Sequence, residues 1–196
     1  WIQNKSKPRN IFALFIGSVK TSQPNSNVLR RLLHTQCMES QTQSSIGNTK
    51  SNCLWVKTAH SCTGVIGQQN MMLQLRNSIF CPAPTGDSIT RKGIFDSLIA
   101  GCIPVLFSQA SLSQYMWHVS EDNLEKVSIY IPLKDMLQKG LNFMETLKKI
   151  TPDEIKKKQD AIMKLAPSLQ YSIVPPSYGN GSDPNGKKWE PPFIDA

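Results

Sequence analysis

One stretch of the chain, residues 79–107, constrains the fold more than any other part of the sequence. It reads IFCPAPTGDSITRKGIFDSLIAGCIPVLF. This pattern predicts an apolar strand, a tight loop, a helix that opens at Gly86-Asp87-Ser88 and reaches Ala100, a terminating Gly101 and a second apolar strand. Both strands are apolar throughout, as is typical of parallel strands whose two faces are covered.

The rest of the chain continues this alternation of strands and helices. Further strands are predicted at residues 10–17, 53–58 and 127–131. Further helices are predicted at residues 27–37, 67–77, 133–150 with a break at Gly140, and from the Thr151 cap to about Leu165. Residues 38–52 are rich in Ser, Gln and Asn and predict a loop. We therefore expect a doubly wound α/β fold with a Rossmann-like parallel sheet, whose ligand binds beyond the carboxyl ends of the strands.

The length of 196 residues suits one domain or one lobe of a larger fold. We expect residues 1–173 to form that lobe and residues 174–196, which are rich in Pro, Gly and Asn, to form an extended tail. The first residue is Trp1, not Met, so the chain is expected to be a fragment or a processed form. No window approaches the roughly 20 apolar residues that a membrane span needs.

The charge of the chain favours anionic partners. Twenty-two Lys and Arg residues against 14 Asp and Glu residues give a net charge of +8, which favours nucleotides, acidic glycans, acidic lipids or nucleic acids. The densest basic stretch, residues 148–164, also contains three acidic residues and is typical of a solvated helix face. Because aromatic and basic residues do not interleave, no nucleic-acid partner is expected.

The cysteines predict no metal site. The five cysteines are Cys37, Cys53, Cys62, Cys81 and Cys102. None forms the C-x-x-C pair of a zinc ribbon. Cys81 and Cys102 lie in apolar runs and are predicted to be small buried hydrophobic residues. The other three lie in polar sequence, where secretory disulfides occur, and sequons at Asn4 and Asn180 fit a secretory lumen.

Two cations stand at the predicted start of the helix in residues 79–107. Arg91 and Lys92 fall in its first turn, where the helix dipole places positive potential. This conflict disappears if an anion binds there. Asp87 or Ser88 is predicted to cap the helix. The helix amides, the two cations and the hydroxyls of Ser88 and Thr90 would form a cradle for a diphosphate.

Helical periodicity extends this prediction. Arg91 shares a face with Phe95 and Leu98, which aims its guanidinium into a crevice. Asp96 lies one turn deeper, where a carboxylate would accept hydrogen bonds from ribose hydroxyls. The alternative is a surface ion pair between Lys92 and Asp96, with Arg91 in solvent. The sequence has neither the G-x-G-x-x-G nor the Walker pattern here.

The motif F-C-x-x-P-x-G-D-S-x-T-R-x-x-x-F-D-S-x-x-A-G-C-I-P-V-x-F resembles the signature of the exostosin-like glycosyltransferases, family 47, above all their plant xyloglucan galactosyltransferase branch. Residues 15–17, 30–37, 114–117 and 127–131 resemble further motifs of the family, and the resemblance covers residues 9–170. Three departures are Lys20, the nearest cation after the first strand; Lys92, where the family has a second Arg; and Thr58, where it has a cysteine.

The resemblance implies the C-terminal, donor-binding lobe of a GT-B fold. It implies a hexosyltransferase that transfers a sugar, galactose being expected, from a UDP-sugar to a glycan or polysaccharide acceptor with inversion. No metal or other cofactor is implied, because basic side chains and amides stabilise the departing diphosphate. It assigns no catalytic base here, and the chain alone is expected to be inactive because the acceptor lobe is missing.

Carried onto this sequence, the resemblance implies two sets of site residues. The donor-nucleotide set is Gly86, Ser88, Thr90, Arg91, Lys92 and Asp96. The set of sugar or acceptor contacts is Tyr115, Trp117 and His118.

The resemblance also implies the Golgi lumen, with a single-pass type II anchor outside this chain as its membrane contact. Two other functions stay open: a nucleotide-sugar-binding module or partner subunit without activity, and a basic domain that binds acidic glycan.

Overall fold

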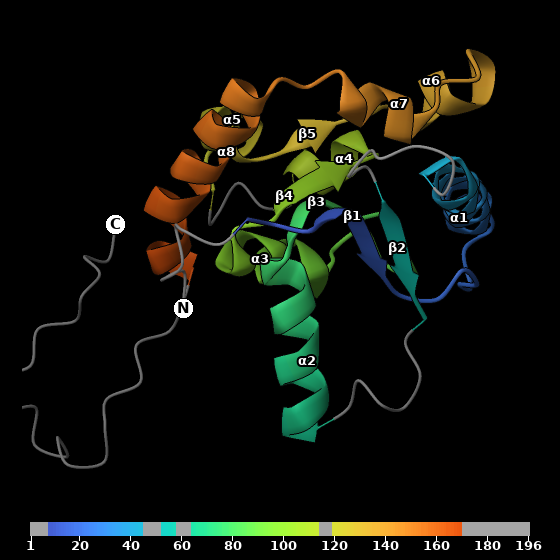
Figure 1. Ribbon diagram of the computed structural model, residues 1–196. Coiled ribbons are helices and arrows are strands. Elements are labelled where there is room, and N and C mark those ends of the chain that lie inside the picture. Colours follow the sequence, from blue (N-terminus) through green and yellow to red (C-terminus); the bar gives the residue numbers. More distant parts are fainter. Residues whose placement is uncertain (1–7, 45–51, 58–63, 114–118, 170–196) are drawn as a thin grey trace, which may run out of the picture.

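A computed structural model describes residues 8–44, 52–57, 64–113 and 119–169 (Figure 1). Five parallel strands form one sheet in the order β2-β1-β3-β4-β5. The strands are β1 (Ile11–Ile16), β2 (Cys53–Val56), β3 (Ser78–Pro82), β4 (Ile103–Leu106) and β5 (Ile129–Tyr130). Because β2 pairs on one side of β1 and β3 on the other, the strand order reverses between β1 and β3.

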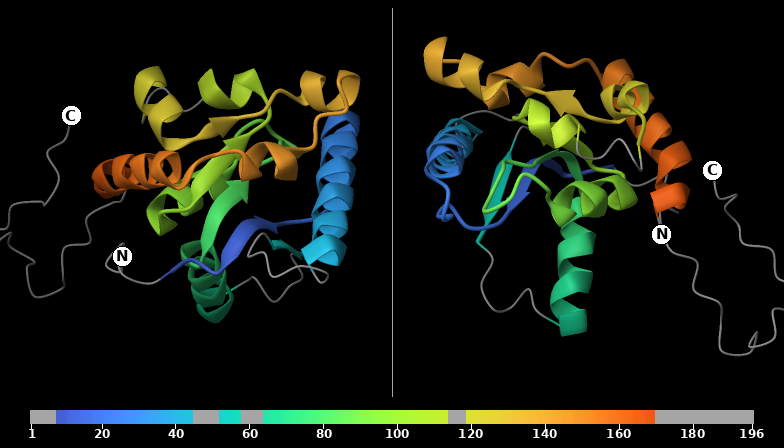
Figure 2. Two further views of the ribbon diagram at one scale, coloured as in Figure 1. Left: turned by 45° about the horizontal axis from the view of Figure 1, so that its top comes forward. Right: turned by 180° about the vertical axis from the view of Figure 1, so that it is seen from behind.

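Helices cover both faces of the sheet, which confirms the predicted doubly wound α/β fold of a GT-B-like lobe. They are α1 (Pro24–Ser44), α2 (Gly64–Arg76), α3 (Lys92–Ala100), α4 (Gln109–Ser113), α5 (Glu121–Val127), α6 (Leu133–Gln138), α7 (Phe143–Lys148) and α8 (Pro152–Leu165), with a 3-10 turn at Ala166–Leu169. Figures 1 and 2 show α2 and α3 on one face of the sheet, while α1 and α7 contact each other on the other.

The apolar side chains of the central strands alternate between these two faces. Ala13 and Phe80 belong to a large core cluster that α1 and α7 help to form. Leu14 and Cys81, the next residue on each strand, belong to a smaller cluster with Leu75 of α2. This alternation covers both faces of β1 and β3, and it explains why both strands are apolar apart from Ser78 at the start of β3.

Most of the predicted helix-end signals are confirmed. Gly101 ends α3 with a left-handed φ of 72°, and its N–H donates to the Leu98 carbonyl. Thr151 and Glu154 form a capping box at the start of α8. Residues 133–150 form two helices, α6 and α7, and Gly140 between them has a φ of 63°.

The secondary structure differs from the sequence analysis in three places. Residues 38–44 continue α1 instead of forming a loop, and their polar side chains bind backbone: Ser40 Oγ donates to Cys37 O (2.7 Å) and Gln41 Nε2 to Cys53 O (2.5 Å). The short helices α4 and α5 were not predicted. The third difference, at the start of α3, concerns the candidate site and is described with it.

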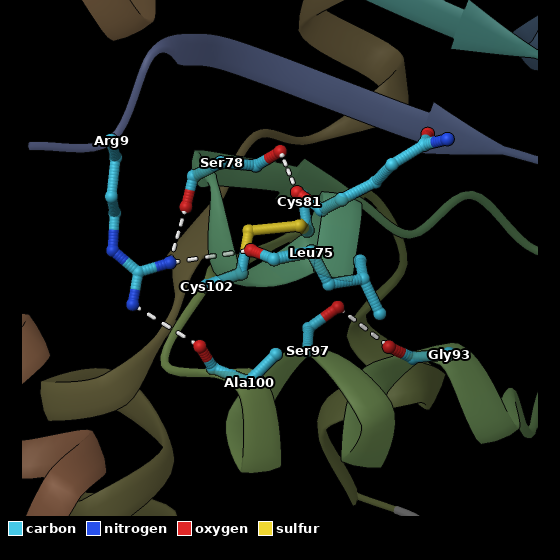
Figure 3. The surroundings of a disulfide bond; sticks show 9 residues. Arg9, Leu75, Ser78, Cys81, Gly93, Ser97, Ala100 and Cys102 are labelled. Atoms are coloured by element: carbon cyan, nitrogen blue, oxygen red, sulfur yellow. Dashed lines mark hydrogen bonds between the residues drawn. A yellow bond between two sulfur atoms is a disulfide. The ribbon is translucent and has the colours of Figure 1, made fainter. Parts of the chain in front are cut away.

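Two disulfides lie within the described residues: the one in Figure 3 corrects the prediction for Cys81 and Cys102, and the other agrees with the disulfide expected among Cys37, Cys53 and Cys62. Cys81 and Cys102 are buried as predicted, but they form a disulfide with each other because they lie on neighbouring strands, Cys81 in β3 and Cys102 just before β4. Cys37 of α1 forms the second disulfide with Cys53 of β2. Cys62, both sequons and the predicted tail from residue 174 lie outside the described residues.

Arg9 binds the C-terminal ends of α2 and α3 beside the Cys81–Cys102 disulfide (Figure 3). Its guanidinium donates to the carbonyls of Leu75 (3.2 Å), Ser78 (2.7 Å) and Ala100 (3.1 Å). Leu75 and Ala100 lie in the last turns of α2 and α3, where helix dipoles place negative potential that favours a cation. Burial lowers the pKa of Arg9 to about 10. Arg9 therefore joins two helices and a strand.

Candidate functional site: a cationic cavity where the strand order reverses

A cavity of about 360 Å³ opens beside the carboxyl ends of β1 and β3. Open α/β sheets bind ligands in such a crevice, at the point where the strand order reverses. One wall is apolar and consists of side chains from β1, α2 and β3, among them Leu14, Ile16, Met71, Leu75 and Cys81. The other wall is the start of α3, with Thr90, Arg91, Lys92, Gly93, Asp96 and Ser97. The predicted site thus faces a cavity.

The helix α3 begins later than predicted. It starts at Lys92, and Arg91 is its N-cap, with extended backbone and no capping hydrogen bond from its side chain. Asp87, a predicted cap, instead accepts hydrogen bonds from the backbone N–H and the hydroxyl of Ser22, both at 2.7 Å. Residues 83–91 therefore form a loop between β3 and α3, which we call the donor loop.

The six predicted nucleotide-binding residues lie on the donor loop and the first turns of α3, but not all reach the cavity. Four of them, Thr90, Arg91, Lys92 and Asp96, line it. Ser88 hydrogen bonds within the donor loop, since its hydroxyl donates to the carbonyl of Thr90 at 2.9 Å.

Gly86, the sixth of these residues, lies beneath Arg91. A Cβ added to Gly86 would overlap the Arg91 guanidinium. Arg91 itself is partly buried instead of extending into solvent.

Lys92 and Asp96 form the ion pair that the alternative interpretation predicted. Both carboxylate oxygens of Asp96 lie within 2.8 Å of Lys92 Nζ. The partners are unequally exposed: the Lys92 side chain is 75% exposed and that of Asp96 only 14%. Because an exposed i,i+4 pair contributes little to stability, Lys92 is able to leave Asp96 for a stronger anion at small cost.

Hydrogen bonds tie the donor loop to the segment that follows β1. Ser26 Oγ, at the start of α1, is hydrogen-bonded to Thr85 Oγ1 (2.9 Å) and donates to Gly86 O (3.1 Å). The Ser22 hydrogen bonds hold the pKa of Asp87 below its ordinary value, and the positive charges of Arg91 and Arg30 act in the same direction. Two segments about 60 residues apart thus form one rim of the site.

Arg30 of α1 is a site residue that the sequence analysis assigned no role. It is 2% exposed, and it donates through Nε to Thr85 O (2.9 Å) and through Nη1 to Ser18 O (2.5 Å). Its position in the sequence carried a signal: Arg30 falls in the same helical stripe as Leu33 and Cys37, which are both buried. An arginine in a buried stripe indicates a specific partner within the fold.

The predicted sugar or acceptor contacts Tyr115, Trp117 and His118 lie outside the described residues. Across the described part of the chain, no cluster of three or more His, Cys, Asp or Glu side chains is arranged to hold a metal ion. Among the same residues, no helix combines the length and the apolarity that crossing a membrane requires.

Comparisons with known proteins identify the family of this chain. Residues 2–150 match the model of the exostosin GT47 domain. The chain is 32% identical over 187 residues to a probable xyloglucan galactosyltransferase of Arabidopsis thaliana, covering 94% of this chain and 36% of that protein. A second probable xyloglucan galactosyltransferase of that plant is 37% identical, covering 87% of this chain and 28% of its own length.

A xyloglucan-specific galacturonosyltransferase of Arabidopsis thaliana is also 37% identical, over 86% of this chain and 24% of its own length. The chain therefore spans about a quarter to a third of the curated relatives it matches. The family model covers most of the chain, and it includes the donor loop and all of α3. The chain belongs to the exostosin GT47 family.

Proposed function

We propose that the chain supplies the donor-binding lobe of an inverting glycosyltransferase, which transfers a sugar, galactose in the first instance, from a UDP-sugar to a glycan acceptor. One observation carries the proposal: the cavity where the strand order reverses has Arg91 and Lys92 on one wall. The names of the relatives support sugar transfer and a xyloglucan-type acceptor. In this proposal residues 1–173 form the lobe.

The proposed chemistry is electrostatic. Breaking the bond between the sugar and UDP leaves negative charge on the diphosphate, and cations fixed beside it lower the barrier. Arg91 is partly buried on the cavity wall and is suited to hold two phosphate oxygens at once. Gly86 gives it space, and the helix amides with Thr90 would add hydrogen-bond donors. No metal or cofactor forms part of the proposal.

Lys92 and Asp96 would exchange partners when the donor binds. The exposed ammonium group of Lys92 would turn from Asp96 to the diphosphate. Asp96, which is nearly buried, would then accept hydrogen bonds from the ribose hydroxyls. The Asp96 carboxylate would thus have a partner in both states. It pairs with the Lys92 ammonium group before the donor binds and would accept hydrogen bonds from hydroxyl groups afterwards.

The proposed compartment is the Golgi lumen. Two disulfides lie within the described residues, and such crosslinks persist in oxidising compartments. A type II membrane anchor outside this chain remains a prediction of the family resemblance.

Titration calorimetry of the chain with UDP and with ADP tests the donor site. We expect UDP to bind and ADP to bind at least tenfold more weakly, a discrimination of about 1.4 kcal/mol. Absence of UDP binding, or equal affinity for both nucleotides, would reject the proposal and favour a basic glycan-binding domain. Sugar transfer by a longer protein that includes the acceptor lobe then separates an enzyme from an inactive binding module.

A further inference from the structure

The first turns of α1 hold the donor loop at its centre. Ser26 and Arg30 stand four residues apart and so lie on the same face of α1. Ser26 Oγ binds Thr85 Oγ1 and Gly86 O, and Arg30 Nε donates to Thr85 O at 2.9 Å. We call Ser26 and Arg30 the α1 clamp. It fixes Thr85 and Gly86, and the Arg91 side chain lies against Gly86.

Burying the Arg30 guanidinium at this position lowers the stability of the fold. Its guanidinium lies 5.3 Å from the centre of the Phe15 ring, and its Nη1 binds Ser18 O in the segment after β1. Its Nη2 is buried and has no hydrogen-bond partner in the part of the chain that the structure describes. Nor does a carboxylate among those residues come within ion-pair distance of it. An incompletely paired buried cation lowers stability, which favours a role other than stability.

Arg30 and Arg91 also influence each other electrostatically. Burial lowers the pKa of Arg30 to about 10, the positive charge of Arg91 contributes in the same direction, and the Asp87 carboxylate opposes it. Two guanidinium groups near one loop repel each other. An anion beside Arg91 would relieve that repulsion, so the charges around the donor loop favour the binding of an anion there.

We propose that Ser26 and Arg30 are positioning residues for the donor: they hold Thr85 and Gly86 so that Arg91 presents its guanidinium to the diphosphate. The inference rests on the proposed function, because it assumes that Arg91 binds the diphosphate of UDP. Both clamp residues are buried, and they act through Arg91 without touching the donor. Their effect on UDP binding therefore requires Arg91.

Two double-mutant cycles test this dependence. UDP affinity is measured by calorimetry on the full 196-residue chain for Arg30→Lys and Ser26→Ala, each with and without Arg91→Ala. With Arg91 present, we expect about tenfold weaker binding for Arg30→Lys and about threefold for Ser26→Ala, and in the Arg91→Ala background less than about twofold for either. Arg31→Lys is the matched control, since Arg31 is the exposed neighbour on α1 and its change is expected to leave UDP binding unaltered.

Each outcome separates the two proposals. Equal losses with and without Arg91, or no loss at all, overturn the clamp while the donor site stands. A wild-type chain that binds no UDP overturns the proposed function, and the clamp falls with it. If Arg30→Lys does not fold, Ser26→Ala still decides, because it removes one hydroxyl and keeps the buried charge.

Discussion

The guanidinium of Arg91 lies directly against the Cα of Gly86, in the space that a side chain at residue 86 would occupy. The contact is steric, because Gly86 does not have the left-handed backbone that only glycine adopts readily. It is also forgiving, since the end of a long side chain is able to move aside. Gly86 therefore controls the place of Arg91 more than the stability of the fold.

Gly86→Ala is expected to displace Arg91 and to weaken UDP binding by up to about 1.5–3 kcal/mol, the range for a hydrogen bond to a charged group. Calorimetry measures the affinity, and urea denaturation is expected to show stability unchanged within about 0.5 kcal/mol. The control is Gly86→Ala in the Arg91→Ala background, where we expect no further loss. A loss there would show that the added methyl group blocks the donor itself.

Arg91→Ala and Lys92→Ala are expected to differ although the two cations are adjacent. Losing Arg91 removes a partly buried, charge-assisted contact and is expected to lower UDP affinity by about 1.5–3 kcal/mol. Losing Lys92, which is mostly exposed, is expected to cost less than about 1 kcal/mol. Calorimetric titrations of both variants check the order, and a folded Arg91→Ala chain with wild-type affinity would contradict the assignment.

Lowering the pH is expected to break the hydrogen bonds that Ser22 donates to the Asp87 carboxylate. The pKa of Asp87 is lowered from 3.8 mainly by the hydrogen bonds from Ser22. A lowered carboxyl pKa gives a contribution to stability that is full above pH 3.8 and lost as pH falls through the folded-state value. NMR titration of the Asp87 carboxyl and the Ser22 amide should give one shared midpoint below pH 3.8. In Ser22→Ala, we expect the midpoint to move back towards 3.8.

Arg9→Ala is expected to destabilise the fold without altering the donor loop. Three carbonyls, in α2, β3 and α3, would lose a cationic donor, which costs about 3 kcal/mol or more in free energy of unfolding. Urea denaturation measures this loss, with Arg31→Ala as the exposed control. A loss below about 0.5 kcal/mol, the scale of a surface substitution, would show that Arg9 does not hold the layer together.

Removing the Cys81–Cys102 disulfide is expected to lower the free energy of unfolding by about 3 kcal/mol, because the bond closes a loop of 21 residues in the unfolded chain. The variant Cys81→Ala/Cys102→Ala is compared with the oxidised wild type by denaturation. As a control, reductant is added to the variant. The further change in its free energy of unfolding then reports the Cys37–Cys53 bond alone. Equal stability of variant and wild type would contradict the prediction.

Local patterns in the sequence predicted the core of this fold. The strands β1, β3 and β4 were identified because buried parallel strands are apolar on both faces. Gly101 and the capping box of α8 were identified because each signal lies within a few residues of the helix end it controls. The positions of Lys92 and Asp96 on the first turns of α3 followed from the same local reasoning.

The features that the sequence analysis missed depend on residues that lie far apart in the sequence. The start of α3 was misplaced because Asp87 binds Ser22, 65 residues away, and so is not available as its cap. Arg30 received no role because its partners, Ser18 and Thr85, meet only once β1 and β3 lie side by side. The pairing of Cys81 with Cys102 likewise follows from strand order, which spacing alone does not give.

The bond between Cys37 and Cys53 has a consequence beyond stability. β2 is four residues long and forms the outer margin of the sheet beyond β1. If reduction released this short strand, β1 would present unpaired N–H and C=O groups that strands of other molecules can pair with. The covalent link to α1 therefore keeps β2 paired with β1 and so protects the edge of β1 from pairing with other molecules. We expect a monodisperse protein only when the Cys37–Cys53 bond has formed.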